Sequence, residues 1–200
     1  LTNPTLAPYA KEGECMLRAT AKAPDRAAAE EMLRPLVEQV RETLGDVVYG
    51  VDVGSLEEVV SGLLRERGLT LSAAESCTGG LIAKRLTDLP GASQVFRGGV
   101  VSYVNEVKAA ALGVPEDLLA ERGAVSEPVA LAMAAGCRRL CGSDLAVSVT
   151  GLAGPEGDDR GNAVGTVFVA LDWGDGALCR RLDLGPGRGR EHIRNAAAQH

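Results

Sequence analysis

Aromatic residues and histidine are both scarce in this sequence. Phe, Trp and Tyr make up 3% of the 200 residues, and the 2 histidines, His192 and His200, lie near its end. Few aromatic rings leave few stacking platforms for single-stranded nucleic acid. Because aromatic residues are scarce, the core must be built from Val, Leu, Ile and Ala. Because both histidines lie near the end, a catalytic base in the middle of the chain must be a residue other than histidine.

Several motifs of common ligand sites are missing as well. The sequence has no C-x-x-C pair and no Gly-Lys-Ser/Thr, which argues against a zinc site and a Walker loop, and we predict neither a metal nor a cofactor. It has no apolar run of about 18 residues, so no membrane-spanning helix is expected. Its few scattered cysteines fit a reducing cytoplasm. A net charge of −6 argues against binding to a nucleic-acid backbone.

The first 54 residues predict a small βαβ module. The opening stretch 1–8 is proline-rich and extended, as a cut within a longer protein would leave it. Alternating positions predict a strand at 13–22, and apolar residues at helical spacing predict a helix from Pro24 to Leu44. The segment 47–53 is interpreted as a second short strand. We place a domain boundary near residue 54, so the predicted domains are 1–54 and 55–200.

Strands and helices alternate in the second predicted domain. Ser55 and Glu58 form a capping-box pattern that opens its first helix. The patterns then predict strands at 69–74, 95–104, 145–149, 164–172 and 178–184, and helices at 79–89, 106–112, 115–122, 128–140 and 190–199. Glycines at 174 and 176 predict a hairpin between the last two strands. The expected fold class is α/β, a three-layer α/β/α domain with a mixed sheet, preceded by the βαβ module.

The strongest local motif is the strand-to-helix junction Glu75-Ser76-Cys77-Thr78-Gly79-Gly80. Ligands of open α/β sheets bind at the carboxyl ends of strands, and a helix N-terminus there presents unpaired N–H groups. Ser76 and Thr78 supply hydroxyls, while Gly79 and Gly80 let a ligand approach the backbone. Taken alone, the pattern is equally typical of a helix N-cap.

A second strand-to-helix junction holds Tyr103, Asn105 and Lys108, which are placed to face one cleft. A serine hydroxyl is a weak nucleophile until a base accepts its proton, and a desolvated lysine loses its own proton nearer neutrality. Lys108 and Tyr103 are therefore the candidate bases. The competing interpretation is a solvated helix lysine and a core or edge tyrosine.

Two glycine-rich segments complete the candidate site. Thr150, Gly151, Ala153 and Gly154 follow a predicted strand, in a loop long enough to present backbone amides to an anion or a carbonyl; a plain surface connection is the alternative. Later in the chain, Arg188 and Arg190 stand at the start of the last predicted helix. An arginine pair at that position is suited to clamp a phosphate or a carboxylate.

Read together, these motifs resemble one family. In order and spacing, the C-terminal domain of the competence/damage-inducible CinA family is similar to residues 56–200. The stretch 4–14 resembles the KH-like middle domain of the same family. The runs that carry the resemblance of the larger domain are Ala74–Gly80, Tyr103-Val104-Asn105 with Lys108, Gly123–Pro128, Thr150–Pro155 and Gly165-Thr166-Val167.

The resemblance implies an enzyme, a nicotinamide-nucleotide amidase of pyridine nucleotide recycling. Such an enzyme, a nicotinamide mononucleotide (NMN) deamidase, hydrolyses the carboxamide of this nucleotide to nicotinate mononucleotide and ammonia. The resemblance also implies Ser76 as nucleophile, Lys108 as general base and Tyr103 as proton relay or positioning partner. Amides around Thr78–Gly80 would stabilise the oxyanion. The implied substrate-binding residues are Glu75, Thr78, Gly79, Gly80, Asn105, Thr150, Gly151, Ala153, Gly154 and, for the 5′-phosphate, Arg190, with Arg188 in reserve.

The KH-like module raises a competing function. KH domains clamp a nucleic-acid backbone with a Gly-x-x-Gly loop, and residues 1–54 contain none. We therefore interpret the module as a spacer or dimer element, and we expect a homodimer. The alternative to an enzyme is a non-catalytic nucleotide-binding or regulatory protein linked to competence or DNA damage.

Overall fold

The computed structural model describes residues 3–11 and 13–200, and it divides into two compact units, Leu1–Leu56 and Glu57–His200. The predicted extended opening at 1–8 begins on residues 1 and 2, which lie outside the described residues. Within the described chain, no helix combines the length and the apolar character needed to cross a membrane.

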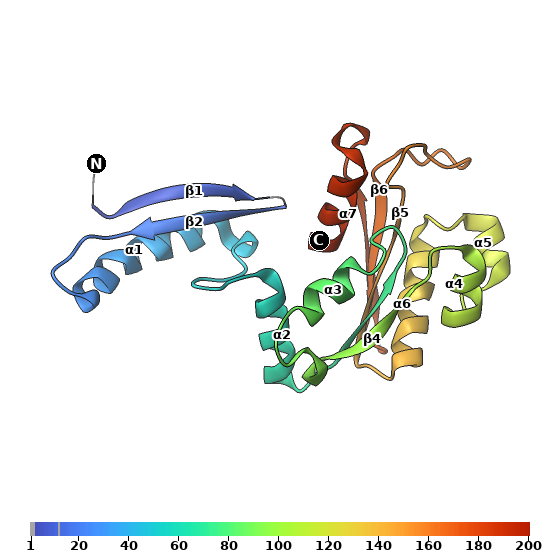
Figure 1. Ribbon diagram of the computed structural model, residues 1–200, viewed down its shortest axis with the longest axis horizontal. Coiled ribbons are helices and arrows are strands. Elements are labelled where there is room, and N and C mark those ends of the chain that lie inside the picture. Colours follow the sequence, from blue (N-terminus) through green and yellow to red (C-terminus); the bar gives the residue numbers. More distant parts are fainter. Residues whose placement is uncertain (1–2, 12) are drawn as a thin grey trace. The chain divides into compact units, whose positions relative to one another are not determined.

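The first unit consists of a hairpin followed by a long helix (Figure 1). Strand β1 (Thr5–Lys11) pairs antiparallel with β2 (Glu14–Thr20). Helix α1 (Arg26–Leu44) begins after Asp25, whose carboxylate accepts a hydrogen bond from the Ala28 N–H at 2.9 Å. The strand predicted at 13–22 and the helix predicted from Pro24 to Leu44 are therefore confirmed.

The order of elements in this unit is ββα, so the predicted βαβ order is wrong. A strand precedes β2, and in the described part of the unit 47–53 forms no strand: Gly45–Val47 is a 3-10 turn (η1) and irregular chain follows. Asp52 has φ +56°. A left-handed residue interrupts the extended backbone that pairing requires, so the alternation of valines there did not produce a strand.

The second unit is built on a five-stranded mixed sheet with the order β4-β3-β5-β6-β7. Three neighbouring strands are parallel to one another, and the last two run antiparallel and form the predicted hairpin. The Trp173 N–H closes that hairpin by donating to the Gly176 carbonyl at 3.0 Å. The bounds are β3 Leu71–Glu75, β4 Phe96–Val101, β5 Leu145–Gly151, β6 Thr166–Asp172 and β7 Ala177–Asp183.

Helices cover both faces of the sheet (Figure 1), which confirms the three-layer α/β/α prediction. On one face lie α2 (Leu56–Arg67), α3 (Leu81–Thr87) and α7 (Gly189–Gln199), and on the other α4 (Asn105–Leu112), α5 (Glu116–Arg122) and α6 (Glu127–Cys141). Short 3-10 turns occupy Ala92–Gln94 (η2) and Pro186–Arg188 (η3). The buried hydrophobic side chains of the described chain are aliphatic or sulfur-containing, and Leu64, Leu86 and Ile193 of the first face and Leu112 and Met133 of the second are examples.

The carboxyl ends of the parallel strands meet at one edge of this sheet. The chain leaves β3 towards β4 on one side and later returns to β5 on the other. Glu75, Val101 and Gly151, the last residues of these strands, therefore lie at the same edge, and α7 begins there after β7. A divergence of connections on either side of a strand is where open α/β sheets bind ligands.

Candidate active site

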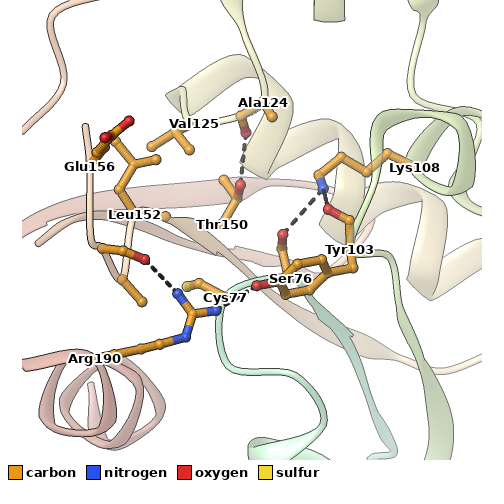
Figure 2. A pocket seen from close by; sticks show the side chains of 13 residues that line it. Ser76, Cys77, Tyr103, Lys108, Ala124, Val125, Thr150, Leu152, Glu156 and Arg190 are labelled. Carbon is orange, nitrogen blue, oxygen red and sulfur yellow. Dashed lines mark hydrogen bonds between the residues drawn. The ribbon is translucent and has the colours of Figure 1, made fainter. Parts of the chain in front are cut away.

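A cavity of about 240 Å³ opens at this edge of the sheet (Figure 2). The lining comes from the turn after β3, from the connection of β4 to α4 and α4 itself, from the segment before α6, from the end of β5 with the loop after it, and from the start of α7. Segments far apart in the sequence thus meet in one small-molecule site. The lining residues are Ser76, Cys77, Tyr103, Lys108, Ala124, Val125, Thr150, Gly151, Leu152, Ala153, Gly154, Glu156 and Arg190.

Ser76 and Lys108 contact each other in the wall of this cavity (Figure 2). The Lys108 Nζ lies 3.2 Å from the Ser76 Oγ. Lys108 is 1% exposed and Ser76 is 8% exposed. The lysine points inwards from α4, whereas the solvated helix lysine that competed with this interpretation would point outwards. The structure therefore brings the two residues together as a buried pair.

Two backbone carbonyls fix the remaining directions around the lysine nitrogen. Nζ donates to the Ser102 carbonyl at 2.7 Å and to the Tyr103 carbonyl at 3.3 Å. An ammonium group has three N–H bonds, so the third direction is that of Ser76. When the ammonium loses one proton, the two carbonyls retain the remaining N–H bonds. The lone pair then faces the Ser76 hydroxyl and is placed to accept its proton.

Burial lowers the pKa of Lys108 to about 8, from an ordinary 10.5. The cause is desolvation, which disfavours the charged form. In the described part of the chain, no carboxylate makes an ion pair with Lys108 that would restore the charged form. A substantial fraction of this lysine is therefore neutral slightly above neutral pH, as a general base requires.

Cys77 also lines the cavity, beside the serine, but it is poorly suited to be the nucleophile. The side chain is buried, and burial raises the pKa of its thiol to about 11. The thiolate is the reactive form of cysteine, and it is almost absent at neutral pH when the pKa is so high. The hydroxyl of Ser76 is therefore the better candidate.

Glu75 holds the turn that carries Ser76, and it does not line the cavity. Its carboxylate, 1% exposed, accepts hydrogen bonds from the N–H groups of Gly80 (2.9 Å), Ile82 (3.1 Å) and Ala83 (2.9 Å). These are the unpaired donors at the start of α3, where negative charge is favoured. The position of Glu75 thus does not support its predicted role in substrate binding. It supports a structural role, in which the carboxylate stabilises the start of α3.

Gly79 and Gly80 have a backbone role as well. Their φ angles are +63° and +95°, a region that residues with a Cβ rarely adopt. They turn the chain from β3 into α3, and neither lines the cavity. The Gly79 N–H donates to the Ser76 carbonyl at 3.0 Å, and the Gly80 N–H is held by Glu75. These two N–H groups are therefore engaged within the turn and are not available to an oxyanion, which differs from the role that the resemblance implies for them.

The amides of Cys77 and Thr78 are the better oxyanion donors. In the chain as described, neither N–H donates to a backbone or side-chain oxygen. Both lie within hydrogen-bonding reach of the Cys77 sulfur, which lines the cavity. The Thr78 side chain is fully buried and does not line the cavity, and its hydroxyl has no hydrogen-bond partner among the described residues. Thr78 therefore contributes through its backbone.

Tyr103 and Arg190 form a second contact across the cavity (Figure 2). One terminal nitrogen of Arg190 donates to the Tyr103 hydroxyl at 2.6 Å, and the other donates to the Gly154 carbonyl at 2.7 Å. A guanidinium group has five N–H donors, so others remain for a ligand. Arg188 does not line the cavity. Of the two arginines expected at a phosphate, Arg190 is the one that faces the site.

The glycine-rich segment predicted to follow the strand lines the cavity as expected, although β5 extends through its first two residues. Thr150, Gly151, Ala153 and Gly154 are all among its walls, and the Thr150 hydroxyl donates to the Ala124 carbonyl at 2.8 Å (Figure 2). Asn105 does not line the cavity. It is the first residue of α4 and is exposed.

Sequence reasoning missed several residues of the site. Ala124, Val125, Leu152 and Glu156 line the cavity, and Arg194 binds the turn after Ser76 from outside. Val125 lies in a motif that carried the family resemblance, and Glu156 directly follows another. Their position in the sequence next to these motifs was the only indication that they belong to the site. Nothing local distinguished Arg194 from a surface arginine. Among the described residues, no group of three His, Cys, Asp or Glu side chains is placed to hold a metal ion.

Two family models match the chain. The model described as the CinA C-terminal domain matches residues 53–200, and the one described as the damage-inducible protein CinA KH domain matches residues 1–50. A CinA-like protein from Kosmotoga olearia is 47% identical over 196 residues, 98% of this chain and 47% of that protein. A putative competence-damage inducible protein from Desulforudis audaxviator is 50% identical over 92% of this chain and 45% of its own length. The chain thus spans about half the length of these curated relatives.

Solved structures resemble this chain over about three quarters of its length. The competence damage-inducible protein A from Klebsiella pneumoniae is 34% identical, with a TM-score of 0.70 over 72% of this chain and 88% of that one. The competence/damage inducible protein from Agrobacterium tumefaciens is 39% identical, with a TM-score of 0.68 over 75% of this chain and 93% of that one.

Proposed function

Because the chain belongs to the CinA family over both of its units, we propose that it hydrolyses the carboxamide of nicotinamide mononucleotide to nicotinate mononucleotide and ammonia. The observation that carries this proposal is the buried contact between the Lys108 Nζ and the Ser76 Oγ. It supplies the two groups that amide hydrolysis needs first, a hydroxyl and a base whose proton affinity is lowered.

In the proposed mechanism the neutral Lys108 amine accepts the Ser76 proton as the Oγ attacks the carboxamide carbon. The N–H groups of Cys77 and Thr78 stabilise the oxyanion of the tetrahedral intermediate. The Lys108 ammonium then returns its proton to the leaving nitrogen, ammonia departs, and an ester on Ser76 remains. A water molecule, deprotonated by Lys108, attacks this ester, and the acid is released as the proton returns to Ser76.

The other walls of the cavity support a zwitterionic nucleotide as substrate. Arg190 is cationic and retains free N–H donors, which suit a 5′-phosphate. Glu156 also lines the cavity, and its negative charge favours a cationic pyridinium ring nearby. Val125, Leu152 and Ala153 are apolar and suit the flat face of that ring. The small volume of the cavity favours a mononucleotide over a polymer.

Ammonia release from nicotinamide mononucleotide by the purified protein, compared with release from free nicotinamide, tests the proposal. We expect the nucleotide to be the far better substrate. Ser76→Ala is expected to lower kcat by a factor of about 10⁴ or more, as for other serine nucleophiles. Ser102→Ala is the matched control, because its buried hydroxyl has no hydrogen-bond partner in the part of the chain that the structure describes, and its carbonyl contact with Lys108 is retained.

Two outcomes would contradict the proposal or part of it. If the protein binds the nucleotide but releases no ammonia at high enzyme concentration, the competing non-catalytic or regulatory function is favoured. Hydroxylamine, added as a competing nucleophile, should divert an ester on Ser76 to the hydroxamate. If hydrolysis proceeds without any hydroxamate, Ser76 orients an attacking water and is not acylated.

The homodimer and the cytoplasmic location suggested by the sequence stay predictions. The same holds for the smaller unit as a spacer or dimer element. Sedimentation of the whole chain, compared with a chain that begins after residue 56, would test whether this unit carries the dimer contact.

A further inference from the structure

Arg194 reaches the turn that carries Ser76 without lining the cavity. From α7, its Nε donates to the Cys77 carbonyl at 3.1 Å, and a terminal nitrogen donates to the Thr78 carbonyl at 2.8 Å. The guanidinium also packs over Gly79, where a Cβ would lie 3.2 Å from that terminal nitrogen. Arg194 is half-buried. One side chain therefore holds two consecutive peptide groups directly after the candidate nucleophile.

The geometry of the peptide group connects this contact to the reaction. The Cys77 carbonyl and the Thr78 N–H belong to one peptide plane, and in a trans peptide they point to opposite sides. Arg194 binds the carbonyl side of this peptide and does not line the cavity, so the Thr78 N–H points away from Arg194. Because Arg194 holds the carbonyl from outside, the N–H is held towards the cavity. Rotation of this peptide would remove the donor from the site.

We propose that Arg194 is a positioning residue, which binds the Cys77 and Thr78 carbonyls and so holds the Thr78 N–H towards the oxyanion. The inference rests on the proposed amide hydrolysis at Ser76. A cationic donor on the carbonyl also polarises the peptide, which strengthens its N–H as a donor. The residue acts through the backbone of the turn, and it makes no contact with substrate.

The expected signature is a loss of kcat with no change in KM. Loss of one oxyanion donor typically lowers kcat by a factor of about 10²–10³, and we expect Arg194→Met to approach the lower figure. Arg194→Lys should fall between the wild type and Arg194→Met, because a single ammonium cannot reproduce the planar fork that spans two carbonyls. In Arg194→Ala, added ethylguanidinium should restore part of kcat.

Arg85→Met is the matched control for an effect on α7 as a whole. Arg85, on α3, is ion-paired with Glu57 and donates to Gln199 at the end of α7. Its loss removes a half-buried arginine and a tether between α3 and α7, and it leaves the 76–79 turn untouched. We expect Arg85→Met to lower the melting temperature and to retain kcat.

The inference is overturned if Arg194→Met keeps the wild-type kcat, or if it raises KM alone, which would make Arg194 a substrate-binding residue. It is also overturned if Arg85→Met and Arg194→Met lower kcat equally, because both losses of kcat would then be explained by a displaced α7. These outcomes are read against an active wild type. A wild type that releases no ammonia instead contradicts the proposed function, and the inference falls with it.

Discussion

The Lys108 Nζ lies 3.2 Å from the Ser76 Oγ, although the two residues are 32 positions apart in the sequence. Each of them follows a different parallel strand, and the sheet brings the ends of those strands together. The lysine is buried against two carbonyls and a hydroxyl, with desolvation as the main influence on its pKa. This arrangement costs folding free energy, and that cost is understandable if the neutral amine is needed.

The rate of ammonia release should depend on the protonation of Lys108. Because the base must be neutral and its pKa is about 8 in the free protein, we expect kcat/KM to rise with pH and to level off above that value. About a tenth of the free enzyme is in the active form at pH 7, one unit below the pKa. The measurement is kcat/KM from about pH 6 to about pH 10. Lys84→Met, which removes an exposed lysine paired with Asp88, should leave the profile unchanged, and a flat wild-type profile would contradict the assignment of Lys108.

Lys108 also links folding stability to pH. Its pKa is about 8 in the folded protein and 10.5 when unperturbed. Between these values the unfolded chain holds a proton that the folded protein has released, so stability increases as the pH rises. Relative to Lys108→Met, the wild type should gain on the order of 3 kcal/mol from pH 7 to pH 11.

Urea unfolding of both proteins across this range is the measurement. Burial raises the pKa of the thiols of Cys77, Cys137 and Cys179, which lowers stability as the pH rises. Cys137 and Cys179 are not influenced by Lys108, so the comparison with Lys108→Met cancels them, whereas Cys77 interacts with Lys108 and is replaced by Ser in both proteins for this measurement. Parallel stability curves for the two proteins would show that Lys108 is not desolvated as described.

Tyr103→Phe distinguishes a positioning role of this tyrosine from a proton relay. Its hydroxyl accepts a hydrogen bond from Arg190 and is not bonded to Ser76 or Lys108. We therefore expect KM for the nucleotide to increase while kcat is nearly retained. Loss of a charge-assisted hydrogen bond, about 1.5–3 kcal/mol, corresponds to roughly a 10- to 100-fold change in KM. A large loss of kcat would instead favour the proton relay.

Arg190→Met should weaken binding through the phosphate. We expect KM for nicotinamide mononucleotide to increase far more than KM for the riboside, which lacks the phosphate. Since Tyr103 and Arg190 contact each other, the double variant should lose less than the sum of the two single losses. Equal effects on nucleotide and riboside would place the phosphate elsewhere in the cavity.

Glu75→Gln should affect stability and leave substrate affinity unchanged. The buried carboxylate accepts three N–H groups at the start of α3, and replacing it by an amide should cost about 2 kcal/mol. Thermal unfolding measures the loss, and KM should stay at the wild-type value. Glu106→Gln, at the exposed first turn of α4, is the control and should unfold as the wild type does. An increased KM for Glu75→Gln would restore it as a substrate-binding residue.

Periodicity in the sequence predicted most of the elements that carry the site. The strands before Ser76 and Thr150 and the helix with Lys108 lie where the alternation and the helical spacing placed them. The hairpin of β6 and β7 followed from the glycines between them. These predictions succeeded because local patterns reflect which side of an element is buried. The segment 47–53 misled because strand formation also requires a partner and an uninterrupted extended backbone.

The sequence by itself determined the three-layer class, the strand-to-helix junctions and the family motifs that contain Ser76, Tyr103, Lys108 and Arg190. Only the tertiary structure decided which of their neighbours face the cavity. Glu75 is engaged by the amides of α3, Asn105 does not line the cavity, and Arg194 reaches back from the last helix. The physical reason is that side-chain direction and hydrogen-bond partners depend on contacts between segments far apart in sequence, which no local pattern records.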